Sequence, residues 1–376
     1  MSTKQGVEYA PAGRQILVFV CGLLIVCVCL AQTAATGYAD DVESSSAKQI
    51  EAQVEKKKPE KRRGHFLPIP IFLTEPAIGY GLGLALTYIH PEKDDTETQK
   101  TPSLHSLKSA AADRSGQKPP PTMTGVAGGY TEKDTWALAV GHSTSWRRDT
   151  IRYVGALART DVNASLYIAD RPFDFNLKGA GFYQDIKFRL GESQFFLGGK
   201  LLLLDTESKF DLLSGLDPVE SSNYGLAAAA MYDTRDNTFT PNQGQLFTLD
   251  VWRYDEALGG DYDYWRGNLK LLSFWQLHPR FVLGLRFETA TVDGSAPFYA
   301  YPWVSLRGVP AMRYQGKTAG QLEVEGRWNI LDRWALVGFA GSGAVHSREV
   351  EGISIAKGDI FAGGLGVRYF LMQDLG

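Results

Sequence analysis

Cysteine is scarce in this 376-residue sequence: three cysteines occur, at positions 21, 27 and 29, and none follows them. Beyond residue 29 the chain therefore cannot form a disulfide bond or a cysteine-ligated metal site. A chain without free thiols suits an oxidising compartment, where stray thiols react. Cysteine usage thus favours export from the cytoplasm.

Charge of one sign is also lacking, because the formal net charge is only −3. This balance gives no support to a nucleic-acid partner or to attachment through a polybasic surface. Long hydrophobic runs are lacking after residue 30, and no later segment reaches the roughly 18 apolar residues of a membrane-spanning helix. If the exported chain enters a membrane, it must do so as a closed β-barrel, whose strands satisfy one another's backbone groups.

The N-terminus has the pattern of a secretory signal peptide. Lys4 and Arg14 precede the apolar run 16–30, and small residues follow that run up to Ala39. A retained membrane helix is the alternative, but the run is shorter than the roughly 20 residues that a bilayer requires. The sequence therefore predicts a signal peptide over 1–39, with cleavage after Ala39.

The rest of the chain predicts one domain with two polar segments. Residues 40–65 carry almost no large apolar side chains, so they are expected to form a solvated polar tail. Residues 66–376 are expected to form a barrel that is interrupted by a long polar loop at 91–121. The 40 glycines favour β-structure over a helical bundle.

Alternation of apolar and polar residues marks the expected strands. In LEVEGRWN, residues 322–329, leucine, valine and tryptophan alternate with glutamate and arginine. A soluble β-sandwich has the same period, but many of the segments exceed the roughly 5–6 residues of a soluble strand, so their length and the export signal favour a membrane barrel. The expected strands are 66–73, where prolines obscure the pattern, and then 78–90, 122–131, 134–145, 150–168, 173–190, 193–207, 222–233, 244–256, 261–276, 280–292, 318–330, 333–346 and 359–371.

Short and long connections alternate between these strands. The connections at 189–193, 275–280 and 329–333 are short, whereas the one at 294–317 is long, as expected of periplasmic turns and extracellular loops. Tryptophans near the strand ends predict an aromatic girdle rather than ligand-stacking sites. They are Trp252, Trp265, Trp275, Trp328 and Trp334.

Two motifs lie between the expected strands. The loop at 294–317 contains Leu306, Arg307, Gly308 and Val309, followed by Tyr314 and Gly316. The turn after 222–233 contains Asp233, Arg235, Asp236, Pro241 and Gly244. On these residues the chain, over roughly 66–371, resembles the BamA/TamA family of outer-membrane barrels, also called bacterial surface antigen proteins.

The resemblance implies an all-β fold, a transmembrane antiparallel barrel of about 16 strands, of which about 14 are present in this chain. It also implies that the loop at 294–317 folds into the lumen and that the seam between the first and last strands is weakly paired. An arginine inside a narrow lumen must find carboxylates. The candidate partners of Arg307 are Glu323, Glu325 and Glu288.

The resemblance further implies a location in the outer membrane of a Gram-negative bacterium, in contact with its lipid. The implied role is to insert or translocate other outer-membrane or exported proteins, with the first strand offering unpaired backbone groups to an incoming strand. The alternative is a passive or solute-conducting outer-membrane pore without a role in protein assembly, which a polar lumen favours. An outer-membrane hydrolase is a third hypothesis, supported by the barrel alone.

The sequence departs from the family pattern in several places. Gly341 stands where the family often has an acidic residue, which puts the usual partner of Arg307 in doubt, and Val309 replaces an aromatic residue. Residues 40–65 leave no room for periplasmic POTRA modules, because an independent core is rare below about 40 residues. The chain as given is also expected to lack its closing strands, which leaves a gap or a strained closure.

Motifs of catalysis and of metal binding are lacking. There is no Gly-x-Ser-x-Gly elbow, and the six histidines are scattered without the spacing of metal ligands. The glycines of 79–83 lie in an alternating strand and not in a phosphate loop. We therefore expect no enzymatic activity, no metal, no cofactor and no nucleic-acid partner, and we expect the turn at Asp233 to have a structural role.

Overall fold

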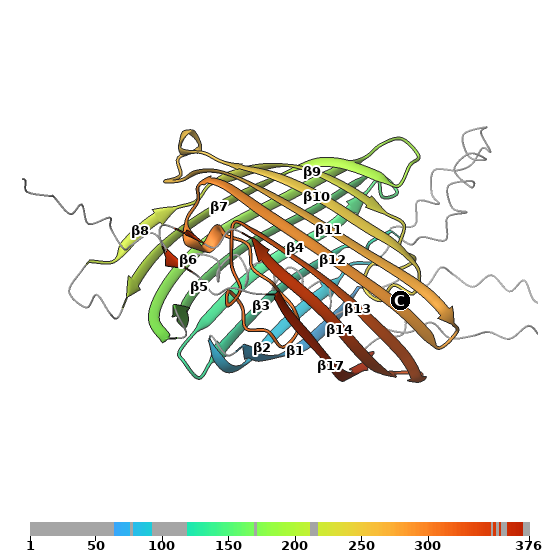
Figure 1. Ribbon diagram of the computed structural model, residues 1–376. Coiled ribbons are helices and arrows are strands. Elements are labelled where there is room, and N and C mark those ends of the chain that lie inside the picture. Colours follow the sequence, from blue (N-terminus) through green and yellow to red (C-terminus); the bar gives the residue numbers. More distant parts are fainter. Residues whose placement is uncertain are drawn as a thin grey trace, which may run out of the picture.

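In a computed structural model of the chain, the structure describes residues 64–75, 78–91, 119–168, 171–210, 217–346, 349–350, 353–354 and 359–370. The predicted signal peptide, nearly all of the polar tail and most of the 91–121 loop lie outside these residues, so they stay predictions. The described part is all-β, as the sequence predicts (Figure 1). Within it, no helix is long or apolar enough to cross a membrane.

Seventeen strands and two short 3-10 turns make up the described elements. The strands are β1 (His65–Glu75), β2 (Gly79–Ile89), β3 (Met123–Thr131), β4 (Trp136–Trp146), β5 (Ile151–Ile168), β6 (Arg171–Arg189), β7 (Phe195–Phe210), β8 (Val219–Ser222), β9 (Gly225–Asp233), β10 (Gly244–Tyr254), β11 (Asp263–His278), β12 (Phe281–Ser295), β13 (Thr318–Leu331), β14 (Trp334–His346), β15 (Glu349–Val350), β16 (Ile353–Ser354) and β17 (Asp359–Tyr369). The 3-10 turns are η4 (Glu256–Leu258) and η5 (Phe298–Ala300).

One antiparallel sheet of 15 strands follows the chain in order from β1 to β17. Since β8 pairs only with β7 and lies off this path, 15 minus one leaves 14 strands along it, which confirms the expected number. The sheet curls into a barrel in Figure 1. Among the described residues no ladder joins β1 to β17, so the sheet is not closed there.

The strand β1 confirms the expectation that prolines hide a strand at 66–73. Its register with β2 is unbroken and pairs Pro68 with Leu86 and Pro70 with Leu84. Antiparallel N–H groups point alternately to the two sides of a strand, and proline has no N–H. The unbroken ladder therefore requires that the nitrogens of Pro68 and Pro70 face away from β2, toward the free edge.

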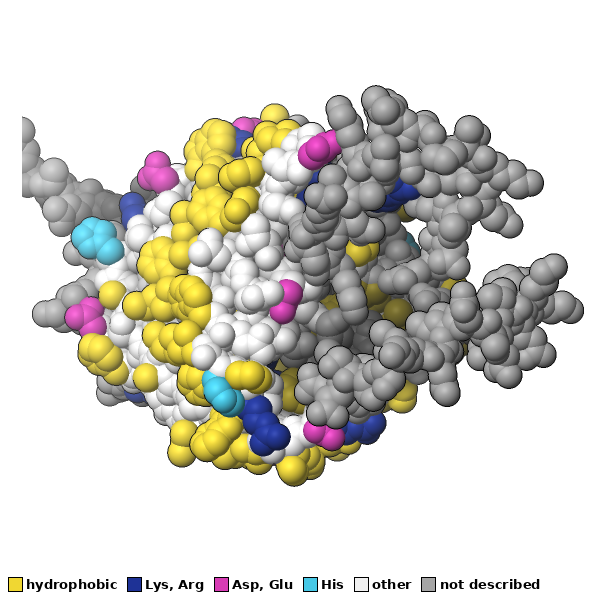
Figure 2. Space-filling view, turned by 90° about the vertical axis from the view of Figure 1, so that its right-hand side faces the viewer, with side chains coloured by type: hydrophobic (Ala, Val, Ile, Leu, Met, Phe, Trp, Pro, Cys, Tyr) yellow, Lys and Arg dark blue, Asp and Glu magenta, His cyan; other side chains and the backbone are white. Residues whose placement is uncertain are grey.

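The two faces of the sheet differ as membrane and lumen surfaces do. On β13, Val324 and Trp328 are 40% and 56% exposed, whereas Glu323 and Arg327 on the other face are 6% and 4% exposed. Figure 2 shows hydrophobic side chains gathered in a broad band on the outside. An apolar band on the outer face, opposite a face of paired charges, fits lipid outside and a polar bore inside.

The two ends of the sheet carry different connections. The short turns 147–150, 190–194, 279–280 and 332–333 lie at one end, here called the turn end. The longer connections, including 255–262 and 296–317, lie at the other, here called the loop end. From β6 onward, short connections at the turn end alternate with longer ones at the loop end, as predicted, apart from the longer turn-end connection 234–243. Before β6 the prediction is wrong, because the short connections 76–78 and 132–135 lie at the loop end and the long connection 90–122 joins β2 to β3 at the turn end. The chain enters β1 and leaves β17 at the turn end.

An apolar cluster crosses the bore near the loop end. Tyr299 and Tyr301 of the connection 296–317 belong to the same buried cluster as Val162, Leu177 and Leu204, whose side chains come from β5, β6 and β7. Each of these side chains is at most 6% exposed. The wall of the barrel and the connection therefore share one core.

One predicted girdle residue is placed wrongly by the sequence. Trp265, Trp275, Trp328 and Trp334 are 41% to 56% exposed on the outer face. Trp252, in contrast, is 7% exposed and stacks on Tyr254 in the inner cluster. Proximity to a strand end does not reveal which face a side chain occupies, and in β10 the register pairs Trp252 with the inward-facing Arg266.

Candidate functional site

The connection between β12 and β13, residues 296–317, is a loop held together by its own hydrogen bonds. It begins with η5, and an isolated bridge then pairs Trp303 with Gln315. The Val304 N–H donates to Tyr314 O at 2.9 Å, and the Gly316 N–H donates to Pro302 O at 3.1 Å. These bonds pair the two arms of the loop with each other. The tip between them lies along the inner face of the sheet.

The tip of the loop makes a sharp turn at the predicted motif. Gly308 has φ +83°, a left-handed conformation that glycine adopts without steric cost. The N–H of Val309 donates to Leu306 O at 3.1 Å, and Leu306 is 4% exposed. This turn leaves the side chain of Arg307 pointing at the neighbouring strands.

Arg307 lies between two glutamates of β13. Its Nη2 is 2.8 Å and its Nε 3.1 Å from the two carboxylate oxygens of Glu323. Its Nη1 is 2.8 Å from Oε2 of Glu325, and its guanidinium carbon lies 3.7 Å from the centre of the Phe339 ring. The planar guanidinium thus has a two-pronged carboxylate contact on its edge and an aromatic ring on its face.

The third candidate partner, Glu288, has other contacts. It accepts from Lys270 Nζ at 3.0 Å and from Gln321 Nε2 at 2.6 Å. Gln321 in turn accepts the backbone N–H of Ser305. Glu288 therefore supports the loop through Gln321 and not through Arg307.

Burial and charge act in opposite directions on Arg307. Partial burial lowers the pKa of Arg307, but the hydrogen bond to Glu323 and the negative charge of Glu325 outweigh it and raise the pKa above the ordinary value. The side chain therefore stays cationic and keeps its two partners throughout the physiological pH range.

Glycines in β14 create the space that the loop fills. A Cβ on Gly343 would lie 2.3 Å from Cγ1 of Val304, and a Cβ on Gly341 would lie 2.9 Å from Cδ2 of Leu306. Both distances are far below a normal carbon contact. Gly341, which departs from the family pattern, thus leaves space for the Leu306 side chain of the loop motif, while Glu323 and Glu325 supply the charge that Arg307 needs.

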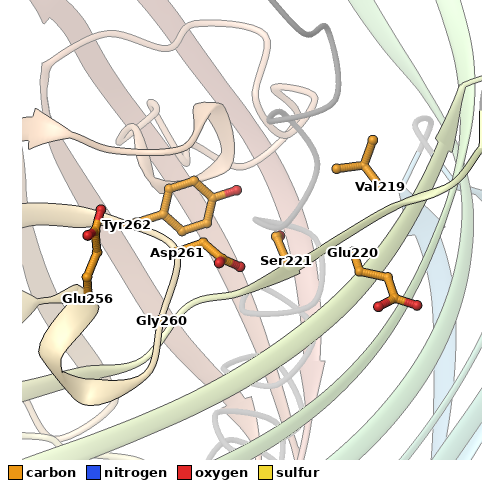
Figure 3. A pocket seen from close by; sticks show the side chains of 7 residues that line it. All are labelled: Val219, Glu220, Ser221, Glu256, Gly260, Asp261 and Tyr262. Atoms are coloured by element: carbon orange, nitrogen blue, oxygen red, sulfur yellow. The ribbon is translucent and has the colours of Figure 1, made fainter.

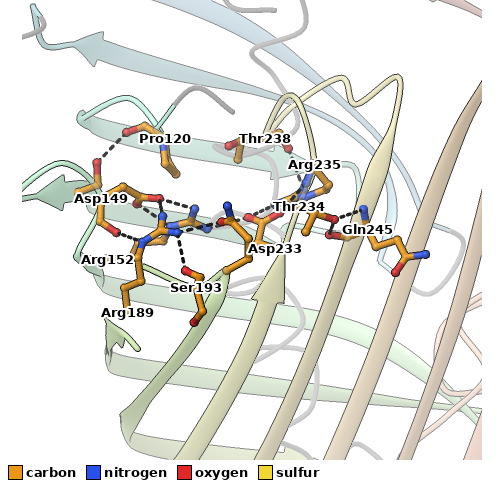
Figure 4. A network of polar contacts seen from close by, with 12 residues as sticks. Pro120, Asp149, Arg152, Arg189, Ser193, Asp233, Thr234, Arg235, Thr238 and Gln245 are labelled. Carbon is orange, nitrogen blue, oxygen red and sulfur yellow. Dashed lines mark hydrogen bonds and ion pairs between the residues drawn. The ribbon is translucent and has the colours of Figure 1, made fainter. Parts of the chain in front are cut away.

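The turn motif after β9 is the centre of a charged network at the turn end (Figure 4). Asp233 is paired with Arg152 at 2.7 Å and with Arg235 at 2.9 Å. Arg152 also binds Asp149 at 2.7 Å, and Asp149 is shared with Arg189. The network joins side chains of β5, β6 and β9 that all lie on the inner face of the sheet.

The other residues of this motif shape the connection 234–243. Oδ1 of Asp236 accepts the N–H of Asn242 at 3.0 Å, and Gly244 has φ +99°. A Cβ on Gly244 would lie 2.2 Å from Thr234 O. Pro241 O accepts a hydrogen bond from Arg327 of β13. Arg152, Arg189 and Arg327 were not among the sequence candidates, although their position on the inner face follows from the two-residue period.

A cavity of about 430 Å³ opens at the loop end (Figure 3). Its lining comes from β8 and from the connection 255–262: Val219, Glu220, Ser221, Glu256, Gly260, Asp261 and Tyr262. The backbone N–H of Ser222 already occupies one oxygen of Asp261 at 2.6 Å. Within the part of the chain that the structure describes, no group of three or more histidine, cysteine or acidic side chains is placed to hold a metal ion.

Comparison with known proteins gives structural but not sequence matches. No protein-family model matches the chain, and no curated protein matches it. BamA from Haemophilus ducreyi lacking POTRA domains 1-3 aligns over 92% of this chain and 72% of its own, with a TM-score of 0.53 and 11% identity.

Two solved CdiB structures are also similar. CdiB from Escherichia coli aligns over 81% of this chain with a TM-score of 0.57 and 13% identity, and CdiB from Acinetobacter baumannii over 82% with a TM-score of 0.53 and 9% identity. This chain spans 56% and 54% of these two proteins. The chain therefore has the antiparallel barrel fold of BamA and CdiB.

Proposed function

We propose that the chain is an outer-membrane barrel of the BamA/TamA type that handles other polypeptides, by helping an incoming strand to pair at the edge of its sheet. The single observation that carries this proposal is that, among the described residues, no strand pairs with the outer edges of β1 and β17 in a sheet with this fold. An unpaired edge offers a row of N–H and C=O groups to another strand. The motifs at Arg307 and Asp233 and the fold of BamA and CdiB support the family assignment.

The two edges differ as templates. The free edge of β1 lacks the donors of Pro68 and Pro70, whereas β17 has no proline between Asp359 and Tyr369. The outward side chains of β17 are apolar, with Leu365 91% and Phe361 80% exposed. Of the two edges that the structure describes, we therefore propose β17 as the better template, for a strand whose own outer face is apolar.

Folding of a client barrel in liposomes tests this proposal. The chain is reconstituted, an unrelated eight-stranded barrel is diluted from urea onto the liposomes, and its folding is followed by gel mobility. We expect faster folding than on protein-free liposomes. A photo-crosslinking residue at position 365 should capture the client, and the same residue at position 72 on β1, whose Phe72 is also highly exposed, should not. Equal folding rates with and without the chain would refute the role.

A solute-conducting pore is the second candidate, because the inner wall carries charged side chains. Lys200 pairs with Asp250 at 2.7 Å, and Lys270 pairs with Glu288 at 3.0 Å. Such pairs favour a wetted bore, while the apolar cluster with Tyr299 and Tyr301 blocks it near the loop end. We propose no enzymatic role.

Planar-bilayer conductance separates the two candidates. We expect low conductance from the intact chain and a large rise when 304–316 is deleted. A steady open conductance of the intact chain, together with no effect on client folding, would favour the pore.

A further inference from the structure

Arg327 is a buried cation to which the described residues offer no ion-pair partner. It lies on the inner face of β13, is 4% exposed, and makes no ion pair with any described carboxylate. Its Nη2 donates to two neutral acceptors, Pro241 O at 3.2 Å and Oδ1 of Asn242. Its Nε has no hydrogen-bond partner within the described structure. Burying a guanidinium in this way is costly, because neutral oxygens replace its hydration only in part.

The acidic groups near Arg327 are already in use. Glu325 binds Arg307 at 2.8 Å and Arg368 at 3.1 Å. Oδ1 of Asp236 accepts the backbone N–H groups of Asn242 and Gln243. Both carboxylates act on Arg327 through space, but among the described residues neither lies within ion-pair distance of it.

Positive charge exceeds negative charge on this part of the inner wall. Three arginines, Arg286, Arg307 and Arg368, share the two glutamates Glu323 and Glu325. Arg327 is a fourth arginine on this wall and has no ion pair with either glutamate. The surplus attracts an anion to the mouth of the bore at the turn end, where a low dielectric strengthens the attraction.

The two hydrogen-bond acceptors of Arg327 belong to a connection that is several strands away from β13 in the sheet. Pro241 and Asn242 precede β10, and β13 is the third strand after β10, about 14 Å away at roughly 4.8 Å per strand. The connection 234–243 therefore bends inward beneath β11 and β12, and its contact with Arg327 ties it across the turn-end mouth.

We propose that Arg327, with Arg368 beside it, is a binding site for a carboxylate presented by a polypeptide at the turn-end mouth. A carboxylate forms stronger, charge-assisted hydrogen bonds than the amide and carbonyl oxygens that Arg327 now uses. Binding replaces Pro241 O and Asn242 Oδ1 and releases the connection 234–243 from β13. This inference goes beyond the proposed function, since it concerns recognition of charge at the mouth and holds for a protein-handling barrel and for a pore alike.

Peptide binding to the full chain in detergent micelles tests the site. The probe is a fluorescein-labelled tetra-glutamate peptide with an amidated C-terminus, and a tetra-glutamine peptide is the neutral control. We expect the glutamate peptide to bind at least about 10-fold more tightly than the glutamine peptide, and Arg327→Gln to weaken it by about 10- to 100-fold. Arg327→Lys should retain most of the binding. Lys270→Gln removes the same charge from a paired position and should leave binding within about 3-fold of the wild type.

A second variant covers the case in which Arg327→Gln does not fold. Asn242→Asp places a carboxylate oxygen where the amide oxygen of Asn242 now contacts Arg327. This variant should therefore fold, have a higher thermal stability than the wild type and no longer bind the peptide. Hydrogen exchange gives an independent measurement: the peptide should speed the exchange of amides 236–243 in the wild type and not in Asn242→Asp.

Each outcome decides between alternatives. Undiminished peptide binding in Asn242→Asp, or in a folded Arg327→Gln variant, overturns the site. Competition by inorganic phosphate as strong as that of unlabelled peptide supports an anion site but assigns it to free oxyanions instead of polypeptides. Loss of peptide binding with normal client folding leaves the proposed function standing, so the two proposals fail separately.

Discussion

Replacing Gly343 with alanine should loosen the loop from the wall of the barrel. The added Cβ would lie 2.3 Å from Cγ1 and 2.9 Å from Cγ2 of Val304, against an optimum of roughly 3.5–4.0 Å. Rotating Val304 exchanges one clashing methyl for the other, and Val304 is only 1% exposed. The loop must therefore move by about 1 Å, and such overpacking costs about 1–3 kcal/mol.

A matched substitution isolates the contact from the general effect of alanine in a strand. Gly366 lies on the same inner face, in β17, and a Cβ there would meet nothing within 4 Å. Alanine in a strand is favoured over glycine by roughly 0.5–1 kcal/mol, so Gly366→Ala should be neutral or slightly stabilising. Gly343→Ala should lose up to about 2.5 kcal/mol after the same gain is subtracted.

Chemical unfolding in detergent micelles, followed by tryptophan fluorescence, measures the difference. The midpoint should fall for Gly343→Ala and should stay or rise for Gly366→Ala. Equal shifts in the two variants would refute the claim that the loop is seated on β14.

Three further perturbations test other parts of the structure. Arg307→Ala removes two ion pairs and the contact with Phe339. Because the Arg307 side chain is 36% exposed, we expect a loss of only about 1–2 kcal/mol of stability, seen as lower heat resistance of the folded barrel on gels. Arg313 is exposed, so the control Arg313→Ala should leave the gel pattern unchanged. Gly244→Ala places a Cβ 2.2 Å from Thr234 O at φ +99°, so it should destabilise the chain by about 2–3 kcal/mol. The control Gly191→Ala should cost less, because Gly191 has φ +59° but open space around it. Equal losses in the two variants would contradict the steric argument. The hydrogen bond from the Ala257 N–H, and next the contact with Arg253, hold the pKa of Asp255 below its ordinary value. The Asp255 carboxylate that caps η4 is therefore fully ionised above a pH of about 4, and the cap should be lost as the pH falls through the lowered pKa. Reduced protection of amides 256–258 from hydrogen exchange would report this loss.

Much of the barrel could be predicted because its strands are long and alternate strictly. The expected segments 244–256 and 318–330 differ from β10 and β13 by one or two residues at their ends. Short pieces such as β8 and the β15–β16 hairpin were missed, since four or two residues contain too little of a two-residue period to detect.

The contacts of the site were harder to predict than its residues. The sequence identifies Arg307 and two of its partners because Glu323 and Glu325 share one face of the next strand. It does not reveal that Arg152 reaches Asp233, 81 residues away, or that Arg327 reaches Asn242, 85 residues away. Periodicity assigns a side chain to a face, whereas contacts across the bore depend on how the sheet curls and how its connections bend inward.

The most direct test of the account is whether neighbouring residues of one strand face lipid and bore in turn. Spin labels at Leu157→Cys and Ala158→Cys, in liposome-embedded chains whose cysteines at 21, 27 and 29 are replaced, can be compared by collision with oxygen, which concentrates in lipid. Leu157 is 53% exposed on the outer face, while Ala158 packs against the inner cluster. The label at 157 should therefore collide with oxygen frequently and the label at 158 rarely. Equal collision rates at the two positions, or frequent collisions of the label at 157 with a water-soluble nickel chelate, would contradict the account.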